Sequence, residues 1–269
     1  MNQQSFNDKV VVITGSTMGI GKVLAMELAA RGAKIVLNGR DIRRLVNTEK
    51  IMHEKGYQAM AVQADVTSYD DCKKIISATV NSYNRIDILV NNAGLAMNGN
   101  ISDLSPEVFK KVMDVNYLGS VYCTIAALPH IIKTKGNILF ISSVAGMMGF
   151  PKYSAYSASK MPLRAFAESL RIELAGTGVH IGINYVGFTY NEPEKLILDA
   201  GGNLVKKNEF SNLKYHSREK VVALLIRQLQ RRKFISNQSI YGKLIVFFKS
   251  FFPGLLMSIL IRARKKGRV

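Results

Sequence analysis

Over the first 186 residues, hydrophobic positions follow two alternating patterns. Short runs rich in Val and Ile are apolar on both faces, and they are separated by longer segments in which apolar residues recur with the period of an α-helix. A run that is apolar on both faces is typical of a strand in a parallel sheet with helices on either side. The pattern therefore predicts an α/β, doubly wound fold of the Rossmann type.

The boundaries of these elements follow from the runs and from residues that favour helix ends. Strands are expected at residues 10–14, 34–38, 58–63, 86–90, 136–142 and 179–185, and a short strand at 233–236 would complete a parallel sheet of seven strands. Helices are expected to begin near Gly19, Asp41, Ser68, Pro106 and Tyr153, with a further helix over Arg218–Gln230. Asp41, Ser68 and Ser105 are favourable N-caps, and Pro106 suits the first position of a helix.

Residues 187–217 interrupt this regular pattern. They are polar, contain Gly201 and Gly202, and form a long connection for a compact domain, which is typical of a binding lid or a locally disordered loop. No linker separates two domains. We therefore expect one catalytic domain over residues 1–236, with the lid inside it, and a C-terminal extension over residues 237–269.

The turn between the first expected strand and the first expected helix is rich in glycine. It reads TGSTMGIGK, with glycines at positions 15, 19 and 21. Glycine lets a backbone approach a pyrophosphate closely, and the N-terminus of the following helix offers free N–H groups to the anion. Glycine-rich turns also serve tight packing, but the position of this one between strand and helix favours a dinucleotide-binding site.

The end of the second strand should indicate which dinucleotide is bound. An acidic residue there binds the ribose 2′-hydroxyl of NAD(H), whereas a basic residue accepts the 2′-phosphate of NADP(H). The chain has Gly39 where the acid is expected, followed by Arg40, whose guanidinium suits phosphate binding. NADP(H) is therefore favoured over NAD(H). The alternative is that Arg40 is only a solvated residue and that Asp41 is only a helix cap.

Three polar residues after the strand at 136–142 have a spacing that suits acid–base chemistry. Ser143 ends the strand, and Tyr156 and Lys160 lie on one face of the expected helix. A nearby ammonium stabilises a phenolate, so we expect Lys160 to contact Tyr156 and to lower its pKa from about 10 toward neutrality. Tyr156 could then act as acid or base, with Ser143 donating to a carbonyl oxygen. Pro162 should bend the helix.

These motifs occur together and in one order along the chain. TGSTMGIG is followed by Asp65-Val66, by NNAG at residues 91–94, by Asn116 and Ser143, and by YSASK at residues 156–160. In this order the chain resembles the short-chain dehydrogenase/reductase family over residues 9–186. Its hydrophobic extension is similar to those of membrane-associated members that reduce steroids and keto-lipids. One departure is Val186-Gly187, where the family usually has Pro-Gly.

The resemblance implies a role for each motif residue. Tyr156 would exchange a proton with the substrate oxygen while hydride passes between the nicotinamide and the carbonyl carbon, and Asn116 would hold a water that relays protons to Lys160. Asp65 and Val66 would lie at the adenine. The implied catalytic residues are Asn116, Ser143, Tyr156 and Lys160. The implied cofactor-binding residues are Gly15, Ser16, Thr17, Gly19, Ile20, Gly21, Arg40, Asp65, Val66, Asn92, Ala93, Gly94, Tyr156, Lys160 and Gly187.

Composition argues against several other kinds of site. The two cysteines, Cys72 and Cys123, have no His/Cys cluster near them, so neither a disulfide framework nor a metal site is expected. The N-terminus lacks the basic, apolar and small-residue pattern of a signal peptide. We therefore expect the catalytic part to be cytoplasmic.

Positive charge is concentrated toward the C-terminus. The net charge is +18, and sixteen of the 37 Lys and Arg residues lie from residue 206 onward, against only two of the 19 acidic residues. Such an excess favours an anionic partner, such as a lipid surface or an acidic carrier protein. Nucleic-acid binding is not expected, because the Phe residues lie within apolar runs and do not alternate with the charges as a base-stacking surface would.

The C-terminal extension is apolar but too interrupted for an ordinary transmembrane helix. Lys243, Lys249 and Pro253 fall within residues 240–261, and a charge near the centre of a spanning helix costs about 2.5 to 3.5 kcal/mol. The residues that would share one helical face farther on are Leu255, Leu256, Ile259, Leu260 and Ala263. This predicts a basic amphipathic helix on an anionic membrane surface. The same residues could instead cover the substrate pocket or a subunit interface.

Together these features predict an NADP(H)-dependent oxidoreductase that interconverts a carbonyl and a secondary alcohol on a small lipophilic substrate. We expect it to be cytoplasmic, peripherally associated with a membrane, and a homodimer or homotetramer through helices at residues 106–132 and 153–175, as the family resemblance implies. One alternative is a 3-oxoacyl-carrier-protein reductase, since a basic surface could bind an acidic carrier. Another is a non-catalytic, nucleotide-binding membrane scaffold.

Overall fold

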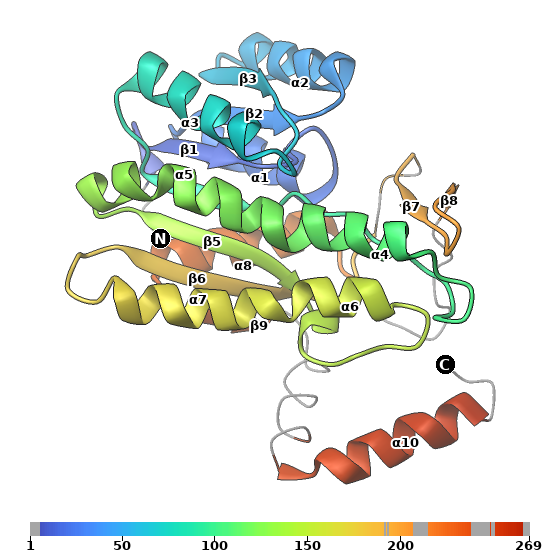
Figure 1. Cartoon of the computed structure of the whole chain (residues 1–269). Coiled ribbons are helices and arrows are strands. Elements are labelled where there is room, and N and C mark those ends of the chain that lie inside the picture. Colours follow the sequence, from blue (N-terminus) through green and yellow to red (C-terminus); the bar gives the residue numbers. More distant parts are fainter. Residues whose placement is uncertain are drawn as a thin grey trace.

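The structure is a computed structural model, and it describes residues 6–190, 192, 194–206, 215–237, 248 and 251–265. Its centre is a parallel sheet of seven strands in the order β3-β2-β1-β4-β5-β6-β9 (Figure 1). The strands are β1 (Val10–Ile13), β2 (Lys34–Gly39), β3 (Ala59–Gln63), β4 (Ile88–Asn91), β5 (Asn137–Ser143), β6 (His180–Val186) and β9 (Ile235–Asn237). The expected doubly wound, seven-stranded fold is confirmed, with strand ends that shift by one or two residues.

Helices cover both faces of this sheet (Figure 1). One apolar core lies between the sheet and α1 (Gly19–Ala29), α2 (Ile42–Glu54) and α8 (Arg218–Gln230). The other lies between the sheet and α3 (Tyr69–Tyr83), α5 (Gly119–Thr134) and α7 (Pro162–Glu173). Successive strand residues alternate between the two cores, as Val10 and Val11 do in β1. The strands are apolar throughout because both faces are buried.

Side-chain caps explain where several helices begin. Asp41, Ser68 and Ser105 each accept a hydrogen bond from the backbone N–H three residues on, as the sequence predicts. Ser217 does the same at the start of α8. Each such cap stabilises its helix by about 1 kcal/mol, so these polar residues set the helix starts locally.

Two helices are interrupted near residues that concern the candidate site. The helix that starts after Tyr153 divides into α6 (Ser154–Lys160) and α7, with Pro162 at the first position of the second segment. The backbone of Met161 between them stays helical, and the expected bend remains a prediction. A π-helical turn over Asp114–Leu118 joins α4 (Pro106–Met113) to α5 and carries Asn116. Nothing in the sequence pattern predicted this turn, which is of a kind often found at functional sites.

The combined helix Pro106–Thr134 is apolar and long. Among the residues that the structure describes, it alone meets the length and composition required to cross a membrane. Cys123, Ala127 and Ile131 are buried in the core beside α3, and Cys123 and Cys72 are both free thiols there. This packing accounts for the apolar composition of the helix.

The expected lid contains more secondary structure than the sequence suggests. β7 (Leu196–Leu198) and β8 (Leu204–Lys206) form an antiparallel hairpin whose turn includes Gly202 at φ 93°. Ile197 and Leu198 are buried, and Leu198 forms a β-bridge with Met97. The hairpin forms because its apolar residues have a buried surface to pack against, which a polar loop would lack.

The C-terminal extension ends in α10 (Pro253–Lys265), which confirms the predicted helix. Its expected single apolar face is only partly confirmed. Leu255 and Ile259 on that face are about half exposed, but so are Met257 and Ile261, which point elsewhere on the helix. Leu260 differs, because it is partly buried at the cleft described below. The side chains of Leu256 and Ala263, and residues 238–247 with Lys249, lie outside the described part of the chain.

Candidate functional site

A large cleft opens at the carboxyl ends of the parallel strands. Its volume is about 1050 Å³, and its walls come from the turns after β1, β2, β4, β5 and β6 together with α6 and the lid. The strand order reverses direction between β1 and β4, and ligands of open α/β sheets bind outside such a switch point. The sheet topology therefore makes this cleft the candidate site.

The glycine-rich turn forms one end of the cleft. Gly15 has φ 61°, and a Cβ there would lie 2.8 Å from Cα of Ala93. A Cβ on Gly21 would lie 2.4 Å from Nδ2 of Asn92, which donates to the carbonyl oxygens of Thr14 and Gly15 at 2.8 and 2.9 Å. The two glycines thus allow the turns after β1 and β4 to interlock.

The predicted cofactor-binding residues fall into two groups. Most of them line the cleft, including Thr17, Gly19 and Ile20 from the glycine-rich turn. Ser16 does not line it. Its side chain is fully buried, and its Oγ accepts a hydrogen bond from the backbone N–H of Asn38 at 2.9 Å. Ser16 therefore ties the glycine-rich turn to β2.

A carboxylate already lies against the N-terminus of α1. The backbone N–H of Gly19 donates to Oε1 of Glu192 at 3.1 Å, and the guanidinium of Arg218 donates to the same oxygen. Lys195 and Arg218 both line the cleft. Sequence reasoning missed these three residues, because they belong to the lid and to α8 and match no motif.

The end of β2 presents two arginines to the cleft. Nη1 of Arg40 lies 3.4 Å from Oδ2 of Asp65, and Arg44 lies one helical turn farther along α2. Burial alone would raise the pKa of the Asp65 carboxyl, but hydrogen bonds from Thr67 and the guanidinium of Arg40 outweigh it and lower that pKa. A Cβ on Gly39 would lie 2.7 Å from Cγ2 of Thr17, so an acidic side chain there would require the Thr17 side chain to move. The sequence analysis missed Arg44, although helical spacing could have suggested it.

Ser143 and Tyr156 both line the cleft, as predicted. Ser143 ends β5, Tyr156 lies on α6, and the two side chains are close enough for Ser143 to affect the pKa of Tyr156. Burial raises the pKa of the Tyr156 phenol above its usual value, Ser143 partly offsets this, and Tyr153 adds to the rise. The expected lowering of the Tyr156 pKa is therefore wrong for this arrangement, because loss of hydration of the phenolate dominates.

Lys160 lies in the cleft, but its hydrogen bond is to a backbone carbonyl group and not to Tyr156. Its ammonium donates to the carbonyl oxygen of Ile141 at 3.0 Å, and the side chain is almost fully buried. Burial and the positive charge of Lys195 lower the pKa of Lys160 to about 8. Because it points to the end of β5, the ammonium supplies no bond to the phenol, although helical spacing keeps the two groups within a turn.

Asn116 lies behind the cleft wall and does not line the cleft. Its Oδ1 accepts from the backbone N–H of Leu95 at 2.7 Å, and its Nδ2 donates to the carbonyl oxygen of Leu95 at 2.9 Å and to Oγ of Ser159 at 2.7 Å. A Cβ on Gly94 would lie 3.3 Å from Oδ1 of Asn116 and 3.4 Å from Nζ of Lys160. Asn116 and Lys160 thus approach Gly94 closely, and the π-helical turn places Asn116 there.

Much of the remaining lining of the cleft is apolar. The apolar and aromatic side chains there include Leu95, Val144, Phe150, Phe188, Tyr190, Ile197 and Leu260. The ring centroid of Tyr215 lies 5.8 Å from that of Phe188 and 5.2 Å from that of Tyr190, with the latter pair stacked. Val186 and Gly187 also line the cleft, so the departure from Pro-Gly lies within it. Such a lining suits an apolar ligand.

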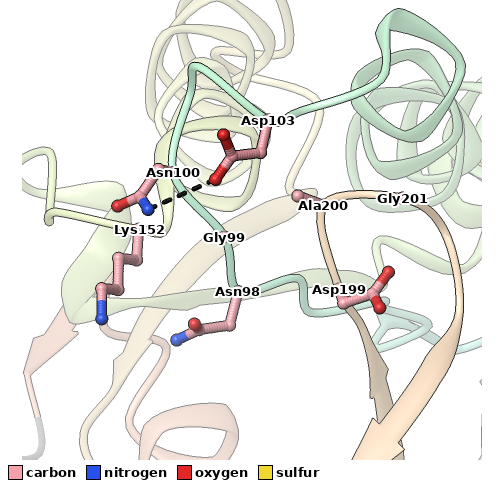
Figure 2. A pocket seen from close by; sticks show the side chains of 8 residues that line it. All are labelled: Asn98, Gly99, Asn100, Asp103, Lys152, Asp199, Ala200 and Gly201. Atoms are coloured by element: carbon pink, nitrogen blue, oxygen red, sulfur yellow. Dashed lines mark hydrogen bonds between the residues drawn. The ribbon is translucent and has the colours of Figure 1, made fainter.

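A second, smaller cavity adjoins the cleft. It has a volume of about 310 Å³ and is lined mainly by polar residues of the segment at 98–103 and of the β7–β8 turn (Figure 2). Nδ2 of Asn100 donates to Asp103 at 3.4 Å within it. Asn98 and Lys152 line both cavities, so the two are neighbours. Over the described residues no group of three or more His, Cys, Asp and Glu side chains could hold a metal ion.

The sequence and structure are similar to known proteins. Residues 9–195 match the family model of the short chain dehydrogenases. The chain is 44% identical over 188 residues to 11-beta-hydroxysteroid dehydrogenase 1A of Arabidopsis thaliana, which covers 68% of this chain and 53% of that protein. It is 29% identical over 264 residues to dehydrogenase/reductase SDR family protein 7-like of Drosophila melanogaster, which covers 96% and 81%. The chain thus spans about half the length of several curated relatives it matches.

Two solved structures share the fold. A short chain dehydrogenase/reductase from Burkholderia phymatum in complex with NAD superposes with a TM-score of 0.82 at 23% identity, covering 95% of this chain and 97% of that chain. An alcohol dehydrogenase from Thermococcus sibiricus complexed with 5-hydroxy-NADP gives 0.73 at 24% identity, covering 86% and 95%. At these identities the likeness concerns the fold.

Proposed function

Because the chain belongs to the short-chain dehydrogenase family, we propose that it is an enzyme that interconverts a carbonyl and a secondary alcohol, with a nicotinamide cofactor. The observation that carries the proposal is the shared position of Ser143, Tyr156 and Lys160 in the main cleft, with Ser143 close enough to Tyr156 to affect its pKa and Lys160 one helical turn away. A nucleotide-binding scaffold needs none of this arrangement, and we therefore favour catalysis.

The residues present fit a dinucleotide. Gly15 and Gly21 allow the glycine-rich turn to pack closely against the turn after β4, and the N–H of Gly19 binds a carboxylate oxygen, an acceptor of the kind that a phosphate also presents. When bound, the cofactor would supply or accept a hydride at the carbonyl carbon. The glycine-rich turn would hold its phosphates, and Asp65 and Val66 would lie at the adenine.

Tyr156 is the group that would hold and move the proton. Its hydroxyl and that of Ser143 would both donate to the substrate oxygen as negative charge develops on it. A charged Lys160 within a helical turn would favour loss of the Tyr156 proton in the oxidative direction. Its pKa of about 8 keeps Lys160 able to exchange a proton near neutrality, and Asn116 would hold the water that relays it.

We propose NADP(H) as the preferred cofactor. Arg40 and Arg44 both line the cleft beyond β2, and Gly39 stands where an acid would bind a 2′-hydroxyl. Two guanidinium groups can bind a 2′-phosphate with charge-assisted hydrogen bonds. NAD(H) lacks that phosphate, so these two guanidinium groups would not add to its binding affinity.

We propose a lipophilic substrate that reaches the cleft from an anionic membrane surface on the cytoplasmic side. The apolar residues that line the cleft support a lipophilic substrate, and the name of the Arabidopsis relative refers to a hydroxysteroid. The exposed apolar residues of α10, with Phe251 and Phe252 before it, support contact with a membrane surface. The basic charges of the C-terminal region add electrostatic attraction to anionic lipids.

We also propose a homo-oligomer, a dimer or a tetramer. Three isoleucines on the outer surfaces of α5 and α7 are exposed: Ile125 at 50%, Ile132 at 38% and Ile172 at 76%. Exposed apolar side chains of this kind commonly lie in interfaces between identical subunits. Sedimentation analysis of the full chain tests the proposal, and a monomer at micromolar concentration would contradict it.

The catalytic proposal is tested with Tyr156→Phe. The matched control is Tyr57→Phe, because Tyr57 lies in the connection between α2 and β3 and does not line the main cleft. Oxidation of NADPH and NADH is followed by absorbance with keto-lipids, steroids and 3-oxoacyl thioesters, free and carrier-bound. We expect Tyr156→Phe to lower turnover by about 10² to 10⁴-fold while cofactor binding changes little, because only the proton donor is lost. Unchanged turnover of every reducible substrate contradicts the mechanism. Activity confined to carrier-bound 3-oxoacyl chains would support the carrier-protein reductase instead.

A further inference from the structure

Three charged side chains from outside the glycine-rich turn meet at the first residue of α1. Oε1 of Glu192 accepts from the backbone N–H of Gly19 at 3.1 Å, and Arg218 donates to the same oxygen. Nζ of Lys195 lies 4.0 Å from the point that a Cβ on Gly19 would occupy. One anionic oxygen is thus held between a helix N-terminus and a guanidinium, with an ammonium nearby.

Arg218 is fixed in this place by the fold. It is the first residue of α8, whose N-terminus is capped by Ser217, and α8 packs in the same apolar core as α1. The side chains of Arg218 and Glu192 are 28% and 23% exposed, so the pair is partly shielded from solvent. A guanidinium placed this way has a defined position relative to the N–H of Gly19.

The position of the shared oxygen has a chemical consequence. A phosphate oxygen at the same point would accept from the N–H of Gly19 and from Arg218 in the same way, and would lie near Lys195. The carboxylate and a pyrophosphate cannot both occupy that point. Binding of the one therefore excludes the other.

Resting on the dinucleotide site proposed above, we infer that Arg218 is a ligand of the cofactor pyrophosphate and that Glu192 competes with the pyrophosphate for Arg218 and for the N–H of Gly19. On binding, Arg218 exchanges one anionic partner for another and is never left unpaired. The apparent affinity for the cofactor equals the intrinsic affinity multiplied by the fraction of molecules in which Glu192 has left the site.

The first test removes the competitor with Glu192→Gln. A partly exposed ion pair is worth about 1 kcal/mol, so neutralising Glu192 should tighten binding of NADPH and NADH alike by about fivefold. The dissociation constants are measured by fluorescence titration of each reduced cofactor, and by competition with inorganic pyrophosphate. Glu194→Gln is the matched control, because Glu194 is exposed two residues away, and it should leave both constants unchanged.

The second test separates a phosphate ligand from a purely structural latch. If Arg218 only held Glu192 in place, Arg218→Leu would release the competitor and tighten cofactor binding. If Arg218 is a phosphate ligand, adding Arg218→Leu to the Glu192→Gln variant should weaken binding of both cofactors by about tenfold relative to Glu192→Gln alone. Arg227→Ala, an exposed arginine on the same helix, is the control.

The outcomes distinguish this inference from the proposed function. If Glu192→Gln binds the cofactor no more tightly than the wild type does, the competition is overturned. If the double variant binds it as tightly as Glu192→Gln alone, or more tightly, the role of Arg218 is overturned. Either result leaves the oxidoreductase proposal standing, since the wild-type chain still binds the cofactor. If the wild-type chain binds neither NADPH nor NADH, both proposals fail.

Discussion

Arg40 offers the sharpest test of cofactor preference, through the substitution Arg40→Ala. The Arg40 side chain is 57% exposed, and its Nη1 lies 3.4 Å from Oδ2 of Asp65. An exposed pair of this kind contributes about 0.2 to 1 kcal/mol, so a 2′-phosphate would detach Arg40 from Asp65 at small cost. Asp65 keeps its hydrogen bonds from Thr67 after that exchange.

The expected effect follows from the difference between these two interactions. A hydrogen bond from a guanidinium to a phosphate contributes about 1.5 to 3 kcal/mol, which leaves a net contribution of about 0.5 to 2.8 kcal/mol after the loss of the Asp65 pair. Arg40→Ala should therefore raise the Kd of NADPH by about 2- to 110-fold. The Kd of NADH should stay the same, because NADH carries a hydroxyl at that position.

The assay is a fluorescence titration of NADPH and NADH at one fixed ionic strength, since salt screens an exposed charge. Arg43→Ala is the matched control, because Arg43 is also exposed on α2 but does not line the main cleft. An equal loss of affinity for both cofactors would place Arg40 at a group they share and refute the reasoning. An unchanged Kd of NADPH would refute it as well, and Arg44→Ala would then be the next variant to measure.

Three further predictions concern stability and surface binding. The pKa of Lys160 is about 8 in the folded protein and higher in the unfolded chain, so the folded state becomes more stable as pH rises between these two values. Urea titrations should show the free energy of unfolding of the wild type rising relative to that of Lys160→Met from about pH 8 to pH 10, by up to about 1.4 kcal/mol per pH unit. Parallel pH profiles of the two proteins would contradict the buried ammonium. Ser217→Ala should lower the free energy of unfolding by about 1 kcal/mol through loss of the α8 cap, whereas Ser169→Ala on the exposed face of α7 should have little effect. The double variant Phe251→Asp, Ile259→Asp should abolish flotation with anionic liposomes but leave turnover of a water-soluble substrate intact, and equal recovery of wild type and variant would defeat the membrane proposal.

The sequence could predict the sheet and most helix starts because local residues determine them. A strand buried on both faces must be apolar throughout, and a helix that begins at Ser68 or Ser105 carries its own cap. The β7–β8 hairpin was not predicted, because its strands are three residues long and depend on contacts with a distant segment around Met97. Short strands of this kind leave little periodic signal.

The candidate site was predictable as a set of residues but not as a set of contacts. Ser143 and Tyr156 meet as spacing suggests, whereas Lys160 bonds to Ile141 rather than to Tyr156. Helical spacing places two side chains near each other, but the acceptor that a buried ammonium chooses depends on the strand beneath it. Glu192 and Gly19 are far apart in the chain and share no motif, so their contact required the fold.

Leu260 joins the C-terminal helix to the cleft. The side chain of this residue of α10 contributes to the cleft wall, although the helix lies apart from the helices that cover the sheet (Figure 1). A protein shortened before α10 would therefore have a wider entrance, and its substrate preferences would differ from those of the full chain. If α10 binds a membrane as proposed, a movement of α10 away from the cleft would remove Leu260 from its wall and so link membrane binding to substrate entry.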